Sequence, residues 1–299
     1  MDAAIQPATR KSYKHHWLEF LRFINSNQHH STVNNVQPIQ LVLFITFLVN
    51  KGLGHATIRN YLSAISFYLK LKGFNDPTTT FVVQKIMIGV KNLSPPSIRR
   101  DPVSIVILDR LIGALPLANL TQYDQIMLKA TMSLMYFGCL RIGEIVISNS
   151  MQHTLKDTQV KISVNPPKVP AINIKFTSYK HLKGSPPMLT LKSLHGKQHC
   201  PVHALQQYLN IRPRKSSQPL ILNQDTTPLN RKQFKKYLDM LIKAAKLNQY
   251  NLNTHSFRIG RTTDMVMSGC YSDTYIQKIG RWSTAAYKQY VRPLIVCPQ

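Results

Sequence analysis

Acidic side chains are scarce in this chain of 299 residues. It carries 12 aspartates and glutamates against 38 lysines and arginines, so its formal net charge is +26. Folding does not need such an excess, and a polyanionic partner is the simplest reason for it. The basic residues are spread along the whole length and form no amphipathic membrane anchor, so nucleic acid fits better than a membrane.

The acids that do occur stand singly. Enzymes that cut DNA with two metal ions hold those ions with clustered carboxylates, whereas most acids here are scattered between Asp101 and Asp273. The phosphate-binding pattern GxxxxGK[ST] is also missing, so neither metal-dependent phosphodiester chemistry nor ATP hydrolysis is expected. The sequence therefore predicts a protein that works without a cofactor.

Long apolar runs and paired cysteines are missing too. The longest apolar stretch, Ile39 to Val49, is about half the span that a bilayer needs and is typical of a buried helix. The N-terminus MDAAIQPATRKSYKHHW has no apolar signal-peptide core. The four cysteines show no CxxC and no framework spacing. We expect reduced thiols and an intracellular location, which means the nucleus if the host is eukaryotic.

One crowded group of possible zinc ligands lies in HGKQHCPVH. These ligands are His195, His199, Cys200 and His203. Ligands this close seldom complete one tetrahedron, and no second pair stands at finger spacing. Pro201 suits the first position of a helix, so we interpret the stretch as a turn that leads into a helix, and we predict no metal site.

The length favours two domains, and a hydrophobic fraction of 43% is typical of a globular protein. Residues 8–93 show helical periodicity, for example the apolar stripe in HATIRNYLSAISFYLKLKG. The stretch SPPSIRRDP is proline-rich and basic, which is typical of a linker. We predict a helical N-terminal domain over residues 1–95, a linker over 96–102 and a second domain over 103–299.

The second half mixes helices and strands. Apolar periodicity predicts helices at 104–115, 122–138, 201–211 and 230–247, and again from Thr254 to the end. Three short alternating runs, VKISV, INIKFTS and MLTLK, are separated by proline and glycine and predict a small sheet. The expected fold class is α+β, mainly α with a small antiparallel β-sheet.

Two stretches of the second half place a basic side chain where chemistry could use it. In CLRIGE, Arg141 directly follows a helix, and Glu144 can orient its guanidinium if the stretch is helical. In SYKHLKG, Lys180 stands at a hairpin tip between two predicted strands, where it could bind a phosphate or donate a proton. A surface ion pair and a solvated loop lysine are the ordinary alternatives.

Two further stretches add polar and aromatic groups. In THSFRIGR, Thr254 is a plausible N-cap, and His255 and Arg258 share one face at a helix N-terminus, where anions bind readily. In GRWSTAAYKQY, the Trp282 indole can donate to a phosphate oxygen, and a tyrosine can attack phosphorus and form a phosphotyrosine. Core packing is the more usual role of both rings, and His-x-x-Arg occurs by chance.

Taken in this order, the four stretches resemble the tyrosine recombinase (phage integrase-like) family. Its catalytic domain carries an arginine, a lysine on a β-hairpin, His-x-x-Arg, a histidine or tryptophan, and last the nucleophilic tyrosine. The resemblance implies that the catalytic residues are Arg141, Lys180, His255, Arg258, Trp282 and Tyr290. It covers nearly the whole chain, with residues 1–95 as the core-binding domain. HSFRIG, IQKIGRWS and YVRP are similar to eukaryotic mobile-element recombinases of the Crypton, DIRS and Ngaro kind.

The same resemblance separates the two tyrosines near the end of the chain. In those elements a tyrosine follows the tryptophan of GRW by eight residues and precedes a branched apolar residue and an arginine. Tyr290 fits this spacing, whereas Tyr287 comes five residues after Trp282. Bacterial relatives often have a spacing of nine. Lys183 lies close to Lys180 on the same predicted loop and is the alternative for the lysine.

The resemblance implies a site-specific DNA recombinase that cleaves and rejoins DNA through a 3′-phosphotyrosine link, without metal or ATP, to integrate or excise a mobile element. The implied partners are double-stranded DNA and copies of the chain, as a dimer on a site and a tetramer in synapsis. Glu144 is predicted to support Arg141, and DNA contacts are predicted at Arg59, Lys183, Arg261 and Arg281. A catalytically silent DNA-binding protein and a type IB topoisomerase are the alternatives.

Overall fold

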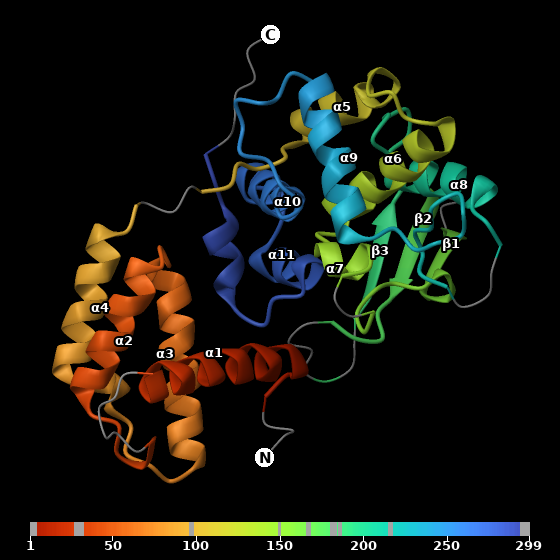
Figure 1. The fold of residues 1–299 in the computed structure, drawn as a ribbon. Coiled ribbons are helices and arrows are strands. Elements are labelled where there is room, and N and C mark those ends of the chain that lie inside the picture. Colours follow the sequence, from red (N-terminus) through yellow and green to blue (C-terminus); the bar gives the residue numbers. More distant parts are fainter. Residues whose placement is uncertain are drawn as a thin grey trace. The chain divides into compact units, whose positions relative to one another are not determined.

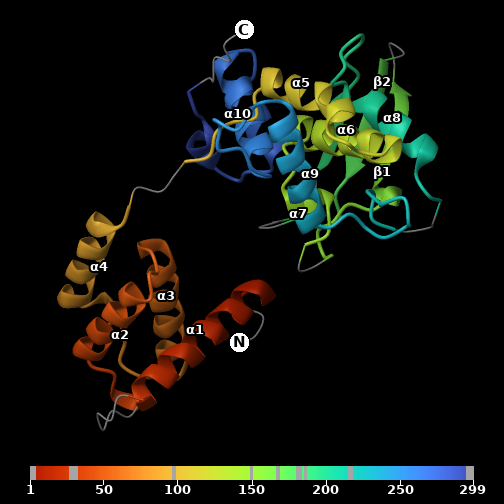
Figure 2. The same ribbon diagram turned by 45° about the horizontal axis from the view of Figure 1, so that its top comes forward.

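The computed structural model describes most of the chain. The described residues are 5–26, 33–95, 99–148, 151–165, 169–179, 184, 187–214 and 218–293. They belong to two compact units, Met1–Ile98 and Arg99–Gln299, and the boundary falls inside the linker predicted over 96–102. Figures 1 and 2 show the helices and strands of each unit. None of the described helices is long and apolar enough to cross a membrane.

The first unit is helical. Its helices are α1 (Pro7–Ser26), α2 (Pro38–Asn50), α3 (His55–Leu71) and α4 (Phe81–Leu93), and 3-10 turns lie at Val33–Asn35 and Pro77–Thr79. The apolar stripe of α3 is buried as predicted and packs with Trp17 of α1 and Phe44 of α2. The prediction of a buried helix holds for one face of α2 alone. Leu41 is fully buried but Ile39 is 60% exposed, because a helix in so small a unit has neighbours on one side.

The second unit combines helices with one small sheet. Its helices are α5 (Ile105–Gly113), α6 (Gln122–Phe137), α7 (Ile142–Ile145), α8 (Pro201–Ile211), α9 (Arg231–Ala244), α10 (Ser256–Met267) and α11 (Asp273–Gly280), with 3-10 turns at Leu115–Leu117, Asp157–Gln159 and η6 (Ala285–Tyr290). Strands β1 (Val160–Asn165), β2 (Val169–Lys175) and β3 (Met188–Lys192) are antiparallel neighbours in that order. The predicted fold class, mainly α with a small antiparallel sheet, is confirmed.

Helix α6 lies at the centre of the second unit's core. Nearly all of its second half is buried. It packs against α8, which lies against β2 and β3, and it also packs against α10 (Figure 1). The end of α6 and the beginning of α10 therefore meet, and Arg258 of α10 bonds to the carbonyl of Cys139, which is 119 residues earlier in the sequence.

Two left-handed turns direct backbone carbonyls to this meeting point. After α6, Cys139 has φ 44, and the N–H of Leu140 donates to the Met135 carbonyl at 3.0 Å, which closes the helix end as in a Schellman motif. After α11, Arg281 has φ 57. Residues with a Cβ seldom adopt this conformation. Both turns must therefore be held by tertiary contacts.

The first residues of the second unit are fastened to the beginning of α10. The N–H of Val103 donates to the Ser256 carbonyl at 2.9 Å, and the N–H of Asn251 donates to Asp101 Oδ2 at 2.8 Å. A Cβ added to Gly260 would lie 1.7 Å from the Val103 carbonyl oxygen, so only glycine allows this approach. Residues 99–102 of the predicted linker thus form part of the second unit.

The left-handed residue after α9 gives a stability prediction. Lys246 is exposed with φ 54, and Leu247 N–H donates to the Ile242 carbonyl at 2.9 Å, again as in a Schellman motif. Lys246→Gly should raise the free energy of unfolding by about 1 kcal/mol, because glycine has no Cβ to strain in this conformation. Urea unfolding measures the change. Lys246→Ala keeps the Cβ and should give no gain; an equal gain in both variants would contradict the explanation.

Candidate active site

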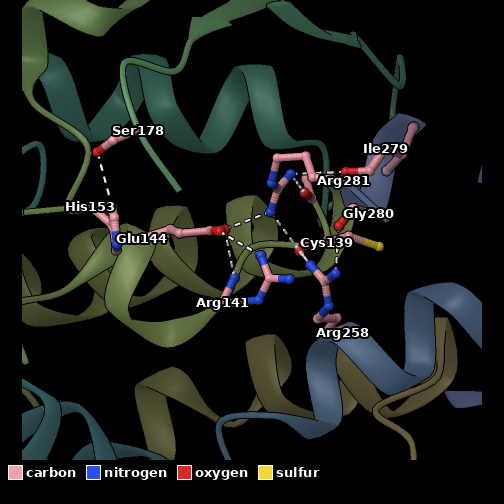
Figure 3. Close-up of polar contacts among 10 residues, drawn as sticks. Cys139, Arg141, Glu144, His153, Ser178, Arg258, Ile279, Gly280 and Arg281 are labelled. Carbon is pink, nitrogen blue, oxygen red and sulfur yellow. Dashed lines mark hydrogen bonds and ion pairs between the residues drawn. The ribbon is translucent and has the colours of Figure 1, made fainter. Parts of the chain in front are cut away.

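Arg141 and Glu144 form the first part of the site, at the beginning of α7. The backbone N–H of Arg141 donates to Glu144 Oε2 at 2.9 Å, and its guanidinium Nη1 donates to Oε1 at 3.0 Å. The Glu144 side chain is 2% exposed, whereas that of Arg141 is 24% exposed. A buried carboxylate thus holds the guanidinium of a half-buried arginine, as the sequence predicts for this pair (Figure 3).

Arg281 binds the other side of the same carboxylate. Its Nη2 lies 2.5 Å from Glu144 Oε2, and the Arg281 side chain is 1% exposed. The guanidinium also donates to three carbonyls, those of Gly138 at 3.1 Å, Ile279 at 2.8 Å and Cys139 at 3.0 Å. The predicted DNA contact at Arg281 does not fit this position. The left-handed turn after α11 directs the side chain inward, where Nη1 and Nη2 are bonded to four acceptors (Figure 3).

Arg258 lies fully buried beside this pair. Its Nη1 donates to the Cys139 carbonyl at 2.5 Å, and its Nη2 donates to the Gly280 carbonyl. Its Nε has no hydrogen-bond partner among the described residues. Burial, followed by the charges of Arg141 and Arg281, lowers the pKa of Arg258 to about 10. The guanidinium is therefore still charged at pH 7.

Two aromatic rings, those of Trp282 and Tyr290, lie against the Arg258 guanidinium. The Trp282 ring centroid lies 4.0 Å from the guanidinium carbon of Arg258, and that of Tyr290 lies 5.6 Å from it. The ring of Tyr290 is 5.1 Å from that of Trp282 and 5.3 Å from that of His255. Tyr287 is 2% exposed and packs into the core. Of the two tyrosines, Tyr290 is therefore the one whose ring stands beside both Arg258 and His255.

The helix that carries His255 and Arg258 begins one residue later than predicted. His255 itself occupies the position before α10, and Thr254 makes no capping bond to the helix. Asn253 and Ser256 close the turn instead, since Asn253 N–H donates to Ser256 Oγ at 3.0 Å. The prediction of Thr254 as the N-cap is wrong, because the serine inside the first turn provides the local acceptor.

Four charged groups thus share one small volume at the junction of α6, α7, α10 and α11. They are the guanidinium groups of Arg141, Arg258 and Arg281 and the carboxylate of Glu144, three positive charges and one negative. Backbone carbonyls and aromatic rings contact the buried guanidinium groups of Arg258 and Arg281 and replace bulk water around them. Such a preorganised cationic site favours an anion, and in low dielectric it acts more strongly than exposed charges do.

The neutral state of His255 gives a pH prediction. Burial, then the charges of Arg258, Arg100 and Arg141, lowers its pKa from 6.5 to about 4. The unfolded chain therefore takes up this proton first, so the contribution of His255 to stability is complete above pH 6.5 and is lost as the pH falls through 4. NMR titration of the DNA-free protein should show one imidazole titrating well below pH 6.5. That signal should disappear in His255→Gln; a His255 signal that titrates near 6.5 would contradict the burial argument.

The remaining predicted residues are placed as follows. Lys180 and Lys183 lie outside the described residues. Arg59 is exposed on α3. Arg261 is half-buried, its guanidinium lies 5.3 Å from the Phe137 ring, and it lines a cavity of about 720 Å³. The DNA contacts predicted at Arg59 and Arg261 stay predictions.

Two of the four rejected zinc ligands have other contacts. His199 Nδ1 lies 2.6 Å from Asp109 Oδ1, and Cys200 Sγ accepts from the N–H of Leu194 at 3.2 Å. Pro201 opens α8, as predicted. Within the described part of the chain, no three histidine, cysteine or acidic side chains are grouped so that they could hold a metal ion.

Sequence reasoning missed two parts of the site. One is the burial of Arg281, and the other is the Cys139 carbonyl, which accepts from both Arg258 and Arg281. The burial of Arg281 left no local signal, because the left-handed residue after a helix is usually a glycine, and here Gly280 is still helical while Arg281 takes the left-handed position. A backbone carbonyl leaves no signal in the residue types, because every residue has one.

Comparisons with known proteins find a family model and several solved structures that are similar to this chain. The model of the Phage integrase family matches residues 109–293. The integrase of the Tn1549 transposon, solved with transposon right end DNA, has a TM-score of 0.65 at 14% identity and covers 98% of this chain and 91% of its own. The XerH site-specific recombinase, in a post-cleavage complex with palindromic difH substrate, has a TM-score of 0.64 at 16% identity, over 94% and 75%.

A dimer of lambda integrase bound to a COC′ core site is also similar, with a TM-score of 0.61 at 14% identity over 96% of this chain and 72% of its own. At these identities the likeness concerns the fold. It extends through both compact units, since each structure covers more than nine tenths of this chain. No curated protein sequence matches the chain significantly.

Proposed function

Because the chain belongs to the phage integrase family, whose model matches residues 109–293, we propose that it is a site-specific DNA recombinase. It cleaves a DNA strand by attack of Tyr290, keeps the end as a covalent 3′-phosphotyrosine, and rejoins it to a second 5′-hydroxyl. The observation that carries this proposal is the position of Tyr290. Its ring lies 5.6 Å from the guanidinium carbon of Arg258 and 5.3 Å from the ring of His255.

Each side chain of the site has a role in this reaction. Arg141 and Arg258 bind the two non-bridging oxygens of the scissile phosphate, where negative charge builds up in the transition state. Trp282 donates its indole N–H to one of them. Transfer of a phosphoryl group is mostly a matter of positioning and charge stabilisation. A site with two guanidinium groups directed by Glu144 and by the Cys139 carbonyl fits that requirement.

The bonds and protons balance as follows. The Tyr290 oxygen forms a bond to phosphorus while the bond from phosphorus to the 5′-oxygen breaks. The phenolic proton passes to His255, which is neutral in the DNA-free protein at pH 7, and the leaving 5′-oxygen takes a proton from Lys180, an assignment that rests on the family pattern. The number of phosphodiester bonds is unchanged, so a 5′-hydroxyl can reverse the step without ATP.

The partners and the biological setting belong to the same proposal. Double-stranded DNA is the substrate, as in the complexes of the Tn1549 integrase and XerH, and a dimer on each site is supported by the lambda integrase complex. Strand exchange takes place in a tetramer. The stretches HSFRIG, IQKIGRWS and YVRP support a mobile element of the eukaryotic Crypton, DIRS or Ngaro kind, and such a protein acts in the nucleus.

A suicide-substrate assay tests the function. Duplexes from the DNA that flanks the element, each nicked next to a possible cleavage site, are incubated with the protein in EDTA. We expect an adduct that survives SDS and is lost on protease treatment. Joined products from two labelled duplexes identify a recombinase, whereas relaxation of a supercoiled plasmid without joining identifies a topoisomerase. Tight binding with no adduct on any flanking duplex would overturn the proposal in favour of a binding-only protein.

A further inference from the structure

Arg281 stands at the centre of the site, where its Nη1 and Nη2 are bonded to three backbone carbonyls and to the Glu144 carboxylate. We infer that Arg281 is a positioning residue, which sets the two phosphate-binding arginines by sharing the Glu144 carboxylate with Arg141 and the Cys139 carbonyl with Arg258. The inference rests on the proposed function and adds a residue to its machinery. Figure 3 shows the arrangement, with Arg281 on one side of Glu144 and Arg141 on the other.

The carboxylate of Glu144 is the first shared group. Oε2 accepts from Arg281 Nη2 at 2.5 Å and from the Arg141 backbone N–H at 2.9 Å, and Oε1 accepts from Arg141 Nη1 at 3.0 Å. Glu144 and Arg281 are both almost completely buried, so neither side chain can turn to solvent when the other moves. Arg281 thereby fixes the plane of the carboxylate, and the carboxylate fixes the guanidinium of Arg141.

The Cys139 carbonyl is the second shared group. It accepts from Arg258 Nη1 at 2.5 Å and from Arg281 Nη2 at 3.0 Å. Arg281 also donates to the Gly138 carbonyl at 3.1 Å, so it binds two successive carbonyls of the left-handed turn that ends α6. This turn is strained at Cys139, whose φ is 44. Arg281 thus holds the turn in the conformation that presents the Cys139 carbonyl to Arg258.

Aromatic rings hold Arg281 from the sheet side. Its guanidinium carbon lies 4.6 Å from the Phe176 ring and 6.0 Å from the Tyr179 ring, in the segment that follows β2. In the chain, Arg281 directly precedes Trp282, whose ring covers Arg258. One side chain therefore contacts the turn after α6, the last turn of α11, the start of α7 and the segment after β2. A residue with these contacts determines geometry at several elements at once.

Arginine is required here because of its shape. Arg281 uses Nη1 and Nη2 for separate acceptors, and a planar guanidinium donates to several acceptors in fixed directions. A lysine would keep the charge and lose these directions. We therefore expect Arg281→Lys to bind DNA as the parent protein does, and to form the covalent adduct about 100-fold more slowly at saturating protein, as is typical of a misplacement near 1 Å.

Arg212 provides the matched control. It is as buried as Arg281 by relative exposure, 8% for each. It donates to the carbonyls of Leu220 and Pro219 at 2.9 Å and has no contact with the site. Arg212→Lys should lower the melting temperature like Arg281→Lys and leave the adduct rate per folded molecule unchanged.

A substrate with a neutral scissile group distinguishes a positioning role of Arg281 from a general loss of protein stability. The same nicked duplex is made with a neutral methylphosphonate at the scissile position. Its transition state carries less negative charge and therefore depends less on stabilisation by the arginines. The loss in Arg281→Lys should fall to less than about tenfold on this substrate, because less negative charge builds up in the transition state. Phe176→Leu removes the ring that lies against Arg281 and should show the same substrate dependence to a smaller degree, which keeps the test available if Arg281→Lys does not fold.

Each outcome decides the matter. The positioning role is supported if Arg281→Lys loses less of its adduct rate on the methylphosphonate than on the phosphate. Its DNA affinity must also be unchanged, and Arg212→Lys must form the adduct at the parent rate. If Arg281→Lys loses the same factor in adduct rate on both substrates, and the loss follows the decrease in melting temperature, Arg281 is only structural and the inference is overturned. Weaker DNA binding with an unchanged rate at saturation makes it a DNA contact and also overturns it. If the parent protein itself forms no adduct, the proposed function fails first and the positioning role falls with it.

Discussion

Tyr290→Phe should bind DNA as tightly as the parent protein and form no covalent adduct. The substitution removes one hydroxyl and keeps the ring in place between Trp282 and His255, whose centroids are 5.1 and 5.3 Å away. Loss of a nucleophile commonly costs a factor of at least about 10⁴, so no adduct should be visible on an SDS gel after a day. DNA affinity, measured by electrophoretic mobility shift, should change less than twofold.

Tyr287→Phe is the control for this prediction. Tyr287 lies three residues earlier in the same 3-10 turn, but it is 2% exposed and packs against Trp282 with 6.2 Å between the ring centroids. The variant should form the adduct at close to the parent rate. An adduct that persists in Tyr290→Phe and is lost in Tyr287→Phe would make Tyr287 the nucleophile and would contradict the assignment of Tyr290.

Glu144→Gln should cause the largest loss of stability. Three guanidinium groups surround this buried carboxylate, and the substitution leaves them without a counter-charge. Removing one partner of a buried ion pair typically costs about 3–5 kcal/mol, because the other charge stays buried. We expect this decrease in the free energy of unfolding at pH 7, measured by urea titration, together with slower adduct formation. A loss below 1 kcal/mol would mean that water reaches the site.

The pH dependence of the same carboxylate supplies a second check. Burial raises the pKa of Glu144, but Arg281 and Arg141 outweigh it, and the net pKa lies below the ordinary 4.5. The stabilisation is therefore complete above pH 4.5 and is lost as the pH falls through the lower folded value. The parent protein should lose stability in this acid range more steeply than Glu144→Gln does. Parallel curves for the two proteins would contradict the assignment.

Much of the fold could be predicted from the sequence because local patterns agree with it. The apolar stripe of α3, the alternation in β3 and the proline that opens α8 each leave a signal within a few residues. The site could not be predicted from local patterns in the same way. It brings together Arg141, His255, Arg258, Trp282 and Tyr290. No local pattern joins residues on α7, α10 and η6, and their order in the chain pointed to one site only through the family resemblance.

The errors have a common physical cause, which is that burial depends on distant neighbours. Arg281 was predicted to contact DNA, which an exposed side chain would do most readily. It is buried since a left-handed turn points it at Glu144, which lies 137 residues away in sequence. The apolar run of α2 was predicted to form a buried helix, yet one face is exposed and carries Ile39 at 60% exposure. In both cases the exposure of the side chain is set by neighbours that are distant in sequence, and the residue type alone does not predict it.

The attachment of the second unit's first residues to α10 has a mechanical consequence. Val103 is bonded to Ser256, two residues before Arg258, and its carbonyl lies against the bare backbone of Gly260. Tension on the chain from the N-terminal side therefore reaches α10 before it reaches α5, the next helix in the sequence. A pull on the linker would therefore act first on the helix that carries Arg258 and begins directly after His255.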